Sequence, residues 1–217
     1  IGVDRRLKEF KLSRCDLTRN LYYERKADVQ DRLDIFKKSF PIPHYSAVKF
    51  GKHPNSDERF KGANKHSWTI TNKSKSCTFS AYDKTYELEK RHHIVINEHI
   101  LRLELRFGRS KIIKITKVKD WESQLIEFGS QVEKQQQKFL HRLHMMHFDP
   151  IPLPELLDCI NASKYRDKTK RKLRRIAKKA NGCVSLAAVQ KDCRIKKSEF
   201  IKLLGKFEEM GMGIISY

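Results

Sequence analysis

Five polar residues in three short segments carry groups that could cut a phosphodiester bond. Asp16 and Glu104 supply hard oxygen ligands of the kind that Mg²⁺ or Mn²⁺ prefers. Tyr82 offers an oxygen nucleophile, and Lys84 and Glu87 follow it closely. A phenol is a weak nucleophile because its ordinary pKa is about 10, so a metal or a lysine must stabilise the phenolate. A metal would also neutralise the charge that develops on the attacked phosphate.

Alternating apolar and polar residues predict the strands that hold these groups. Residues 100–107 are the strongest case, because Leu101, Leu103, Leu105 and Phe107 alternate with Arg102, Glu104 and Arg106. One side of this strand must pack into the core, and the other presents a carboxylate between two guanidiniums. Further strands are expected at 8–23, 45–50, 67–72 and 76–82, with a loop at 51–65.

Helical spacing marks several other segments. A helix is expected over 28–40, capped by Asp28 and ended by Pro41. One or two helical turns are expected over 84–90. Apolar residues from Trp121 to Met146 predict one long helix that bends at Gly129. Together with the strands, this pattern indicates an α+β domain in which an antiparallel sheet has flanking helices.

Three prolines between residues 150 and 154 form a semi-rigid connector, and we place a domain boundary there. The expected domains are 1–149 and 150–217. The second is almost entirely helical, with helices at 154–161, 168–180, 184–192 and 197–210. The last two helices resemble a helix-turn-helix, and Ser198 would cap the second of them. A short strand bounded by Gly211 and Gly213 follows and could form a wing. A small helical bundle that only completes the fold is the alternative.

The net charge indicates a polyanionic partner. The 47 Lys and Arg residues outnumber the 26 Asp and Glu residues, which gives a formal charge of +21. Such a surplus opposes compaction unless an anion lies against it, and nucleic acid is the commonest such partner. Residues 168–179 contain eight cations and no acid, which favours phosphate contacts. The expected DNA-binding residues are Arg14, Arg102, Lys168, Lys170, Arg171, Lys172, Arg174, Arg175, Lys178, Lys179, Lys197 and Lys202.

Several classes of protein are disfavoured by the sequence. No apolar run approaches the roughly 18–20 residues of a membrane span. The five cysteines are odd in number and form no Cys-x-x-Cys pair, so a zinc ribbon or a disulfide framework is not expected. Free thiols fit a reducing cytoplasm. No Gly-x-x-x-x-Gly-Lys-Ser/Thr loop occurs, so any unwinding would need a partner helicase.

The order of three motifs makes the chemistry more specific. Arg-x-Asp-Leu occurs at 14–17, aromatic-x-x-Tyr-x-Lys-x-x-Glu at 79–87, and Leu-Arg-x-Glu at 101–104. In this order they resemble rolling-circle replication initiators, of the type found in staphylococcal plasmids (Rep_trans) and in the gene II/X proteins of filamentous phages. The resemblance spans about half of the chain.

The resemblance implies a function and assigns roles to residues. Tyr82 would be the nucleophile that nicks one strand of an origin through a 5′-phosphotyrosine, assisted by Lys84. Asp16, Glu104 and Glu87 would hold Mg²⁺ or Mn²⁺. The partners would be double-stranded origin DNA, the nicked single strand and a host helicase, in the cytoplasm of a bacterial host. The chain departs from the family at Asn20, where some relatives have a second acid. Only 15 residues precede Asp16, so we expect a truncated amino-terminal end.

The sequence is also compatible with two other functions. The chain could be a non-catalytic origin-binding or regulatory protein that keeps the sheet as a scaffold, or a related transposase or relaxase. A homodimer is compatible with each. In the binding-only alternative, Glu104 is an ordinary ion-pair partner of the arginines on its strand, and Asp16 pairs with Arg14 or Arg19. The nicking mechanism instead requires Tyr82, Asp16 and Glu104 to lie close together.

Overall fold

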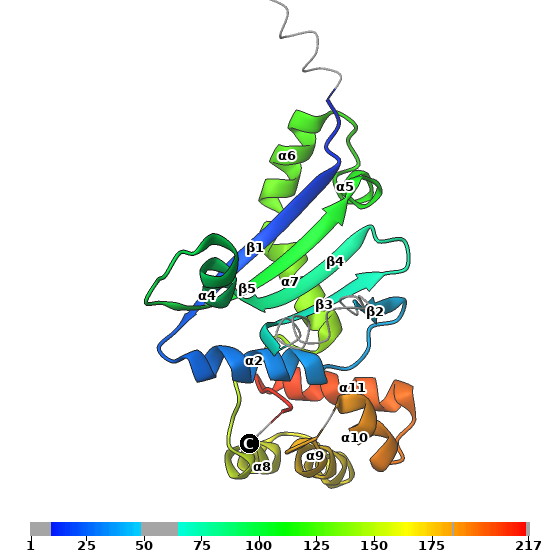
Figure 1. Cartoon of the computed structure of the whole chain (residues 1–217). Coiled ribbons are helices and arrows are strands. Elements are labelled where there is room, and N and C mark those ends of the chain that lie inside the picture. The colour runs from blue at the N-terminus through cyan, green and yellow to red at the C-terminus, as the bar shows by residue number, and fades with distance from the viewer. Residues whose placement is uncertain (1–9, 49–64, 184, 216–217) are drawn as a thin grey trace, which may run out of the picture. The chain divides into compact units, whose positions relative to one another are not determined.

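The chain forms a mixed α+β structure around an antiparallel sheet, as expected (Figure 1). The computed structural model describes residues 10–48, 65–183 and 185–215. The end of the strand expected at 45–50 and almost all of the loop expected at 51–65 lie outside the described residues. The chain divides into two compact units, one made of 1–26 and 43–138 and the other of 27–42 and 139–217.

The first unit contains a five-stranded sheet with the order β1-β5-β4-β3-β2. All of the neighbouring strands run antiparallel. The strands are β1 (Arg14–Tyr23), β2 (Tyr45–Ala47), β3 (Ser67–Asn72), β4 (Cys77–Asp83) and β5 (His99–Gly108). The helix α4 (Lys84–Glu87) and the π-helical turn η1 (Leu88–His92) connect β4 to β5, where helical turns were expected.

The alternation in β5 has the predicted structural result. Leu101, Leu103, Leu105 and Phe107 are at most 4% exposed, whereas the charged residues between them are only half-buried. The core side continues into α5 (Arg109–Thr116) and α6 (Trp121–Ser130), where Ile112 and Phe128 are fully buried. The ring of Phe128 meets that of Phe107 edge to face at 5.3 Å. One face of the sheet is therefore apolar and covered, which leaves the other face for polar side chains.

The second unit is helical in its described residues. It contains α2 (Lys26–Lys38) apart from its first residue, the end of α7 (Val132–Leu143), α8 (Leu153–Ala162), α9 (Asp167–Ala180), α10 (Leu186–Asp192) and α11 (Lys197–Glu209). Aromatic contacts join its two sequence segments, because Phe36 packs on Phe148 and Phe40 on Phe200. Residues 27–42 and 139–149 thus belong to this unit, whereas the prolines suggested a division at 149 and 150.

Several sequence expectations about individual elements are wrong. The helix expected over 121–146 is interrupted at Gln131, whose backbone is non-helical, so α6 and α7 are separate. Gly129 is a poor helix former, and the Ser130 hydroxyl bonds to the Glu127 carbonyl, which offers the backbone an alternative to the helix. The first strand begins at Arg14, whose partner Gly108 is the last residue of β5, and the described residues 10–13 are not part of it. Residues 8 and 9 of the expected strand lie outside the described residues.

The expected strand at the carboxyl end is also absent from the described residues 211–215. Ile214 and Ile215 are buried instead. A Cβ atom on Gly213 would lie 3.0 Å from the carbonyl oxygens of His147 and Asp149, so the backbones pack closely there. Ser198 does not cap α11 either, because the helix begins after Lys196 and no side chain caps it.

Candidate active site

The exposed face of the sheet is polar on its four longest strands. Residues that pair directly across an antiparallel sheet share a face, so the register gives the composition of this face. It has a half rich in charge, from Asp16, Thr18 and Asn20 of β1 and Arg102, Glu104 and Arg106 of β5. The other half is rich in hydroxyls, from Thr78, Ser80 and Tyr82 of β4 and Ser67, Thr69 and Thr71 of β3. The register also places Tyr22 of β1 on this face. Tyr82 lies where the two halves meet.

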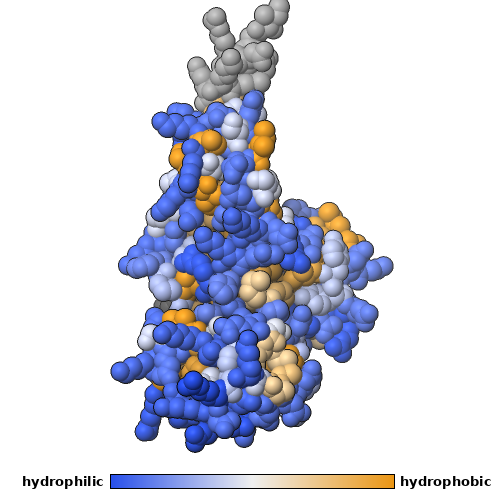
Figure 2. Space-filling model, turned by 180° about the vertical axis from the view of Figure 1, so that it is seen from behind, coloured by the Kyte–Doolittle hydropathy of each residue, from blue (hydrophilic) through white to orange (hydrophobic). Residues whose placement is uncertain are grey.

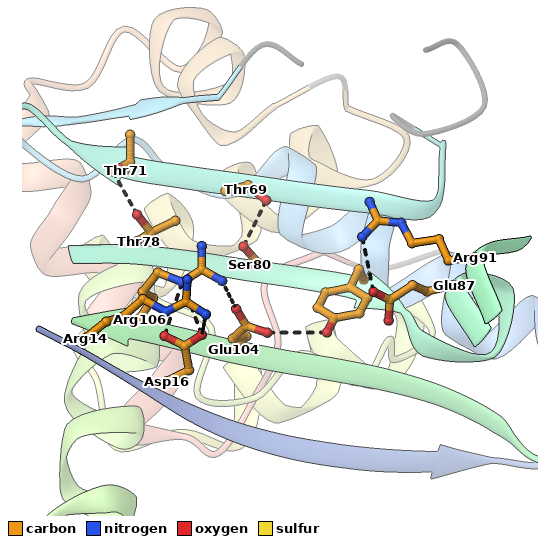
Figure 3. Close-up of polar contacts among 11 residues, drawn as sticks. Arg14, Asp16, Thr69, Thr71, Thr78, Ser80, Glu87, Arg91, Glu104 and Arg106 are labelled. Carbon is orange, nitrogen blue, oxygen red and sulfur yellow. Dashed lines mark hydrogen bonds and ion pairs between the residues drawn. The ribbon is translucent and has the colours of Figure 1, made fainter. Parts of the chain in front are cut away.

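The Tyr82 hydroxyl lies beside a carboxylate. It donates a hydrogen bond to Glu104 Oε2 at 3.3 Å, which a dashed line from the labelled Glu104 marks in Figure 3. Burial raises the pKa of Tyr82 above its ordinary value of 10, and the negative charges of Glu87 and Glu104 raise it further, although Arg102 partly opposes them. The phenol is therefore protonated near neutral pH, and a base already accepts a hydrogen bond from its hydroxyl.

Arg106 links the two carboxylates that were predicted to bind metal. Its Nη2 donates to Glu104 Oε1 at 2.8 Å, and its Nε donates to Asp16 Oδ1 at 3.2 Å. Arg14 pairs with the other oxygen of Asp16 at 2.9 Å. Asp16, Arg106, Glu104 and Tyr82 thus form one continuous chain of polar contacts (Figure 3). The ordinary ion pairs weighed from the sequence are present, and so is the proximity of Tyr82 to Glu104.

The third expected metal ligand has its own cations. Glu87 pairs with Lys84 at 2.5 Å and with Arg91 at 3.4 Å. Within the described parts of the chain, no three His, Cys, Asp or Glu residues form a group that could hold a metal ion. Each of Asp16, Glu104 and Glu87 is paired with a guanidinium or an ammonium, so a metal would have to compete with these cations.

A groove of about 680 Å³ borders the polar face in the described part of the chain. Tyr82, Glu104 and Glu87 all line it, so the structure brings these three predicted residues together. Asp16 and Lys84 are not among its lining residues and reach it through Arg106 and Glu87. Four cations also line the groove: Lys75, Lys90, Arg91 and Arg106. Such a groove suits an anionic ligand with an apolar or hydroxylated portion.

Cross-strand hydroxyl pairs form one wall of the groove. Thr69 Oγ1 donates to Ser80 Oγ at 3.0 Å, and the hydroxyls of Thr71 and Thr78 lie 2.9 Å apart (Figure 3). Because Ser80 accepts the proton of Thr69, its own O–H remains available to a ligand.

Most of the groove residues were not predicted as site residues, among them His66, Asp83 and Tyr86. Asp83 Oδ1 caps α4 by accepting the Tyr86 N–H at 2.9 Å, and Oδ2 lies 3.4 Å from His66 Nδ1. The sequence holds a weak signal for Asp83, because an aspartate that precedes a helical turn is a typical N-cap. The position of His66 follows only from the register of β3 against β4, in which Ser67 faces Tyr82.

The predicted DNA-binding residues near the sheet have structural partners. Arg102 donates to Asn20 Oδ1 at 2.8 Å, so Asn20 holds a guanidinium. Arg14 pairs with Asp16 and is largely exposed. Both arginines lie on strands that carry the polar face, Arg102 in the register of that face and Arg14 at the start of β1.

The basic helix α9 divides into two groups of cations. Lys170 and Arg174 bond to Asn161, and Lys172 pairs with Glu199, so these three hold helices of the second unit together. The exposed group contains Lys168, Arg171, Arg175, Lys178 and Lys179. At 100° per residue these five fall on one side of the helix, opposite the buried Leu173, Ile176, Ala177 and Ala180.

The two cations predicted on α11 differ from each other. Lys197 lies over the Phe40 ring at 5.8 Å, whereas Lys202 is exposed. The same helix also carries Glu199, Glu208 and Glu209. Its charge is therefore mixed, unlike the uniformly basic exposed side of α9.

The surface drawn in Figure 2 is mainly hydrophilic, with scattered apolar residues. Among the described helices, none has both the length and the apolar character needed to cross a bilayer. Comparison of the chain with protein-family models, with curated proteins and with solved structures finds no match.

Proposed function

We propose that this protein is a replication initiator of the rolling-circle type, which nicks one DNA strand through Tyr82. The observation that carries the proposal is the hydrogen bond from Tyr82 to Glu104 in a groove that four cations line. This arrangement supplies a nucleophile, a base within reach of its proton, and positive charge for a phosphate.

The proposed step is a transesterification. Tyr82 Oη attacks the phosphorus of a phosphodiester while its proton passes to Glu104. The bond from phosphorus to the 3′-oxygen breaks, which leaves a 5′-phosphate ester on Tyr82. Glu104 then returns the proton to the departing 3′-oxygen as a hydroxyl. The reverse sequence rejoins the strand, so no cofactor is consumed.

Proton transfer from a phenol to a carboxylate is uphill. Ordinary pKa values of the two groups differ by about 6 units, or about 8 kcal/mol, and the raised pKa of Tyr82 widens the gap. Positive charge near the phenolate and the phosphate must offset this cost. Arg102, which opposes the rise in the Tyr82 pKa, and Arg106, which holds Glu104, are the nearest candidates.

A requirement for Mg²⁺ or Mn²⁺ stays a prediction of the family resemblance. The carboxylates are ion-paired in the described structure, and the proposed step uses only side chains of this protein. Chelation in the nicking assay tests this requirement separately from the identity of the nucleophile.

We assign duplex binding to the second unit. The five exposed cations of α9 would contact phosphates on both sides of a groove in origin DNA, without reading bases. The two consecutive helices α10 and α11 support the helix-turn-helix interpretation. The mixed charge of α11 and the absence of a wing strand in residues 211–215 do not support it. A host helicase would separate the strands after nicking.

The test is formation of a covalent adduct. Wild-type protein, Tyr82→Phe and Tyr22→Phe are incubated with supercoiled and single-stranded DNA that carries candidate origins, with Mn²⁺ or Mg²⁺. Wild type and Tyr22→Phe should give a DNA–protein band that survives denaturant, and Tyr82→Phe should give none. Tyr22 is a matched control because it is 65% exposed and does not line the groove. An adduct in Tyr82→Phe would overturn the assignment.

A binding-only protein is the second candidate. The observation in its favour is Arg106, which occupies both Asp16 and Glu104 as an ordinary ion-pair partner would. Salt-sensitive DNA binding without any adduct would favour this candidate. A transposase or relaxase would share the adduct and differ in its DNA target.

A further inference from the structure

A stacked aromatic pair borders the groove and has no role in the proposed chemistry. The rings of His66 and Tyr86 are 3.6 Å apart between centroids and nearly parallel, with 6° between their planes. Both residues line the same groove as Tyr82. Tyr86 lies one helical turn after Tyr82, on the short helix that follows β4.

One buried carboxylate fixes both members of the pair. Asp83 is 5% exposed. Its Oδ1 accepts a hydrogen bond from the backbone N–H of Tyr86, and its Oδ2 lies beside His66 Nδ1. The pair is therefore held before any ligand arrives, which reduces the ordering cost of binding to it.

His66 is not suited to bind phosphate as a cation. Burial lowers its pKa below 6.5, with smaller contributions from Lys26 and Lys65, and Asp83 only partly opposes them. Near neutral pH the ring is uncharged. What this end of the groove offers is flat aromatic surface, in contrast to the cations and hydroxyls elsewhere in its wall.

We propose that the pair of His66 and Tyr86 is a nucleobase-stacking subsite, which holds one unpaired base of the substrate strand near the phosphate that Tyr82 attacks. This inference rests on the proposed function, which makes single-stranded DNA the ligand. The 3.6 Å spacing of the pair is close to the 3.4 Å spacing of stacked bases, so a base can extend the stack. Stacking accepts any base, because every base has a π-face.

The experiment compares a strand that has bases with one that has none. Fluorescence anisotropy measures the affinity for labelled dT8 and for a strand of eight abasic tetrahydrofuran residues at one salt concentration. All variants carry Tyr82→Phe, so no strand is cut. Because every position of each strand is alike, sliding of the strand does not blur the comparison.

In the parent protein dT8 should bind more tightly than the abasic strand. In Tyr86→Leu and in His66→Leu this preference should fall by roughly five- to hundredfold, as expected for the loss of one stacked base. Affinity for the abasic strand should stay at the parent level, which also shows that the variants are folded. Tyr86→Phe should keep the preference, and so should Tyr22→Leu, which removes an exposed tyrosine outside the groove.

An unchanged preference for dT8 in both Tyr86→Leu and His66→Leu would overturn the subsite. This result is separable from failure of the nicking proposal. If Tyr82 forms the adduct but the leucine variants keep the preference for dT8, only the stacking subsite is contradicted. If the leucine variants lose this preference but no adduct forms, only the nicking mechanism is contradicted.

Discussion

The Tyr82 hydroxyl donates a hydrogen bond to Glu104, its diagonal neighbour on the next strand. The direct partner in β5 is Arg102, and Glu104 faces Ser80. Diagonal pairs lie within reach of long aromatic side chains. One phenol thereby has a carboxylate that accepts its proton and a guanidinium that opposes the rise of its pKa. The antiparallel register alone brings these two groups to it.

Glu104→Gln should slow adduct formation by about 10²–10⁴-fold, because the variant lacks the proposed general base. It should also lower the pKa of Tyr82, because a negative charge that raises it is gone. Adduct yield over time measures the first effect. Ultraviolet titration of tyrosinate, with Tyr82→Phe subtracted, measures the second. A normal nicking rate together with a lowered pKa would exclude Glu104 as the base.

Arg106→Gln should bind Mn²⁺ about 10–100-fold more tightly than wild type. A metal and Arg106 would compete for Asp16 and Glu104, and the variant lacks the charge-assisted bonds of the arginine. Electron paramagnetic resonance of free Mn²⁺ in a titration gives the affinity. Arg19→Gln changes the net charge equally and should bind Mn²⁺ as wild type does. Equal affinity in Arg106→Gln and wild type would mean that the two carboxylates are not metal ligands.

Arg175→Gln should reduce the salt dependence of duplex binding. Its side chain belongs to the exposed group of α9, and each lost phosphate contact should decrease the log–log slope by about 0.9. Arg174→Gln is the matched control, because this arginine already bonds to Asn161. Anisotropy titrations over a KCl series measure the slopes. If both variants changed the slope equally, the prediction that only the exposed cations of α9 contact phosphates would be wrong.

The stability of the first unit should depend on the protonation of His66. Its folded pKa is lowered, so the folded state resists protonation, and stability is fully present above the unfolded pKa of about 6.5. Stability should be lost as the pH falls from there through the folded pKa. Chemical denaturation at several pH values between 7.5 and 5.5 should show a smaller loss for His66→Gln than for wild type. An equal loss of stability in the two proteins would contradict the lowered pKa of His66.

The sequence predicted the elements of the site well because period-two alternation is a local signal. Strands β3, β4 and β5 and the position of Tyr82 next to a polar row all follow from it. The pair of Arg106 and Glu104 within β5 was among the alternatives weighed from the sequence. The bond from Arg106 to Asp16, 90 residues away, depends on the pairing of β1 with β5 and could not be predicted in the same way.

The errors in the fold have a similar cause. The apolar spacing from Trp121 to Met146 is helical throughout, and the break at Gln131 depends on local backbone bonding that spacing does not report. The prolines at 150–154 mark a change in composition. The actual grouping of 27–42 with 139–217 rests on aromatic contacts such as Phe36 with Phe148, which no local pattern reveals.

The interleaving of the two units fixes the order in which a growing chain can complete them. A ribosome makes residues 27–42 early and then all of 43–138 before the rest of the helical unit exists. Until then Val29, Leu33 and Phe36, which are at most 1% exposed in the finished protein, have no partners from that segment. The sheet can therefore assemble during synthesis, whereas the helical unit forms last. Proteolytic cleavage near residue 150 would separate α2 from α8–α11 and so split the helical unit, whereas both segments of the sheet unit would stay on one fragment.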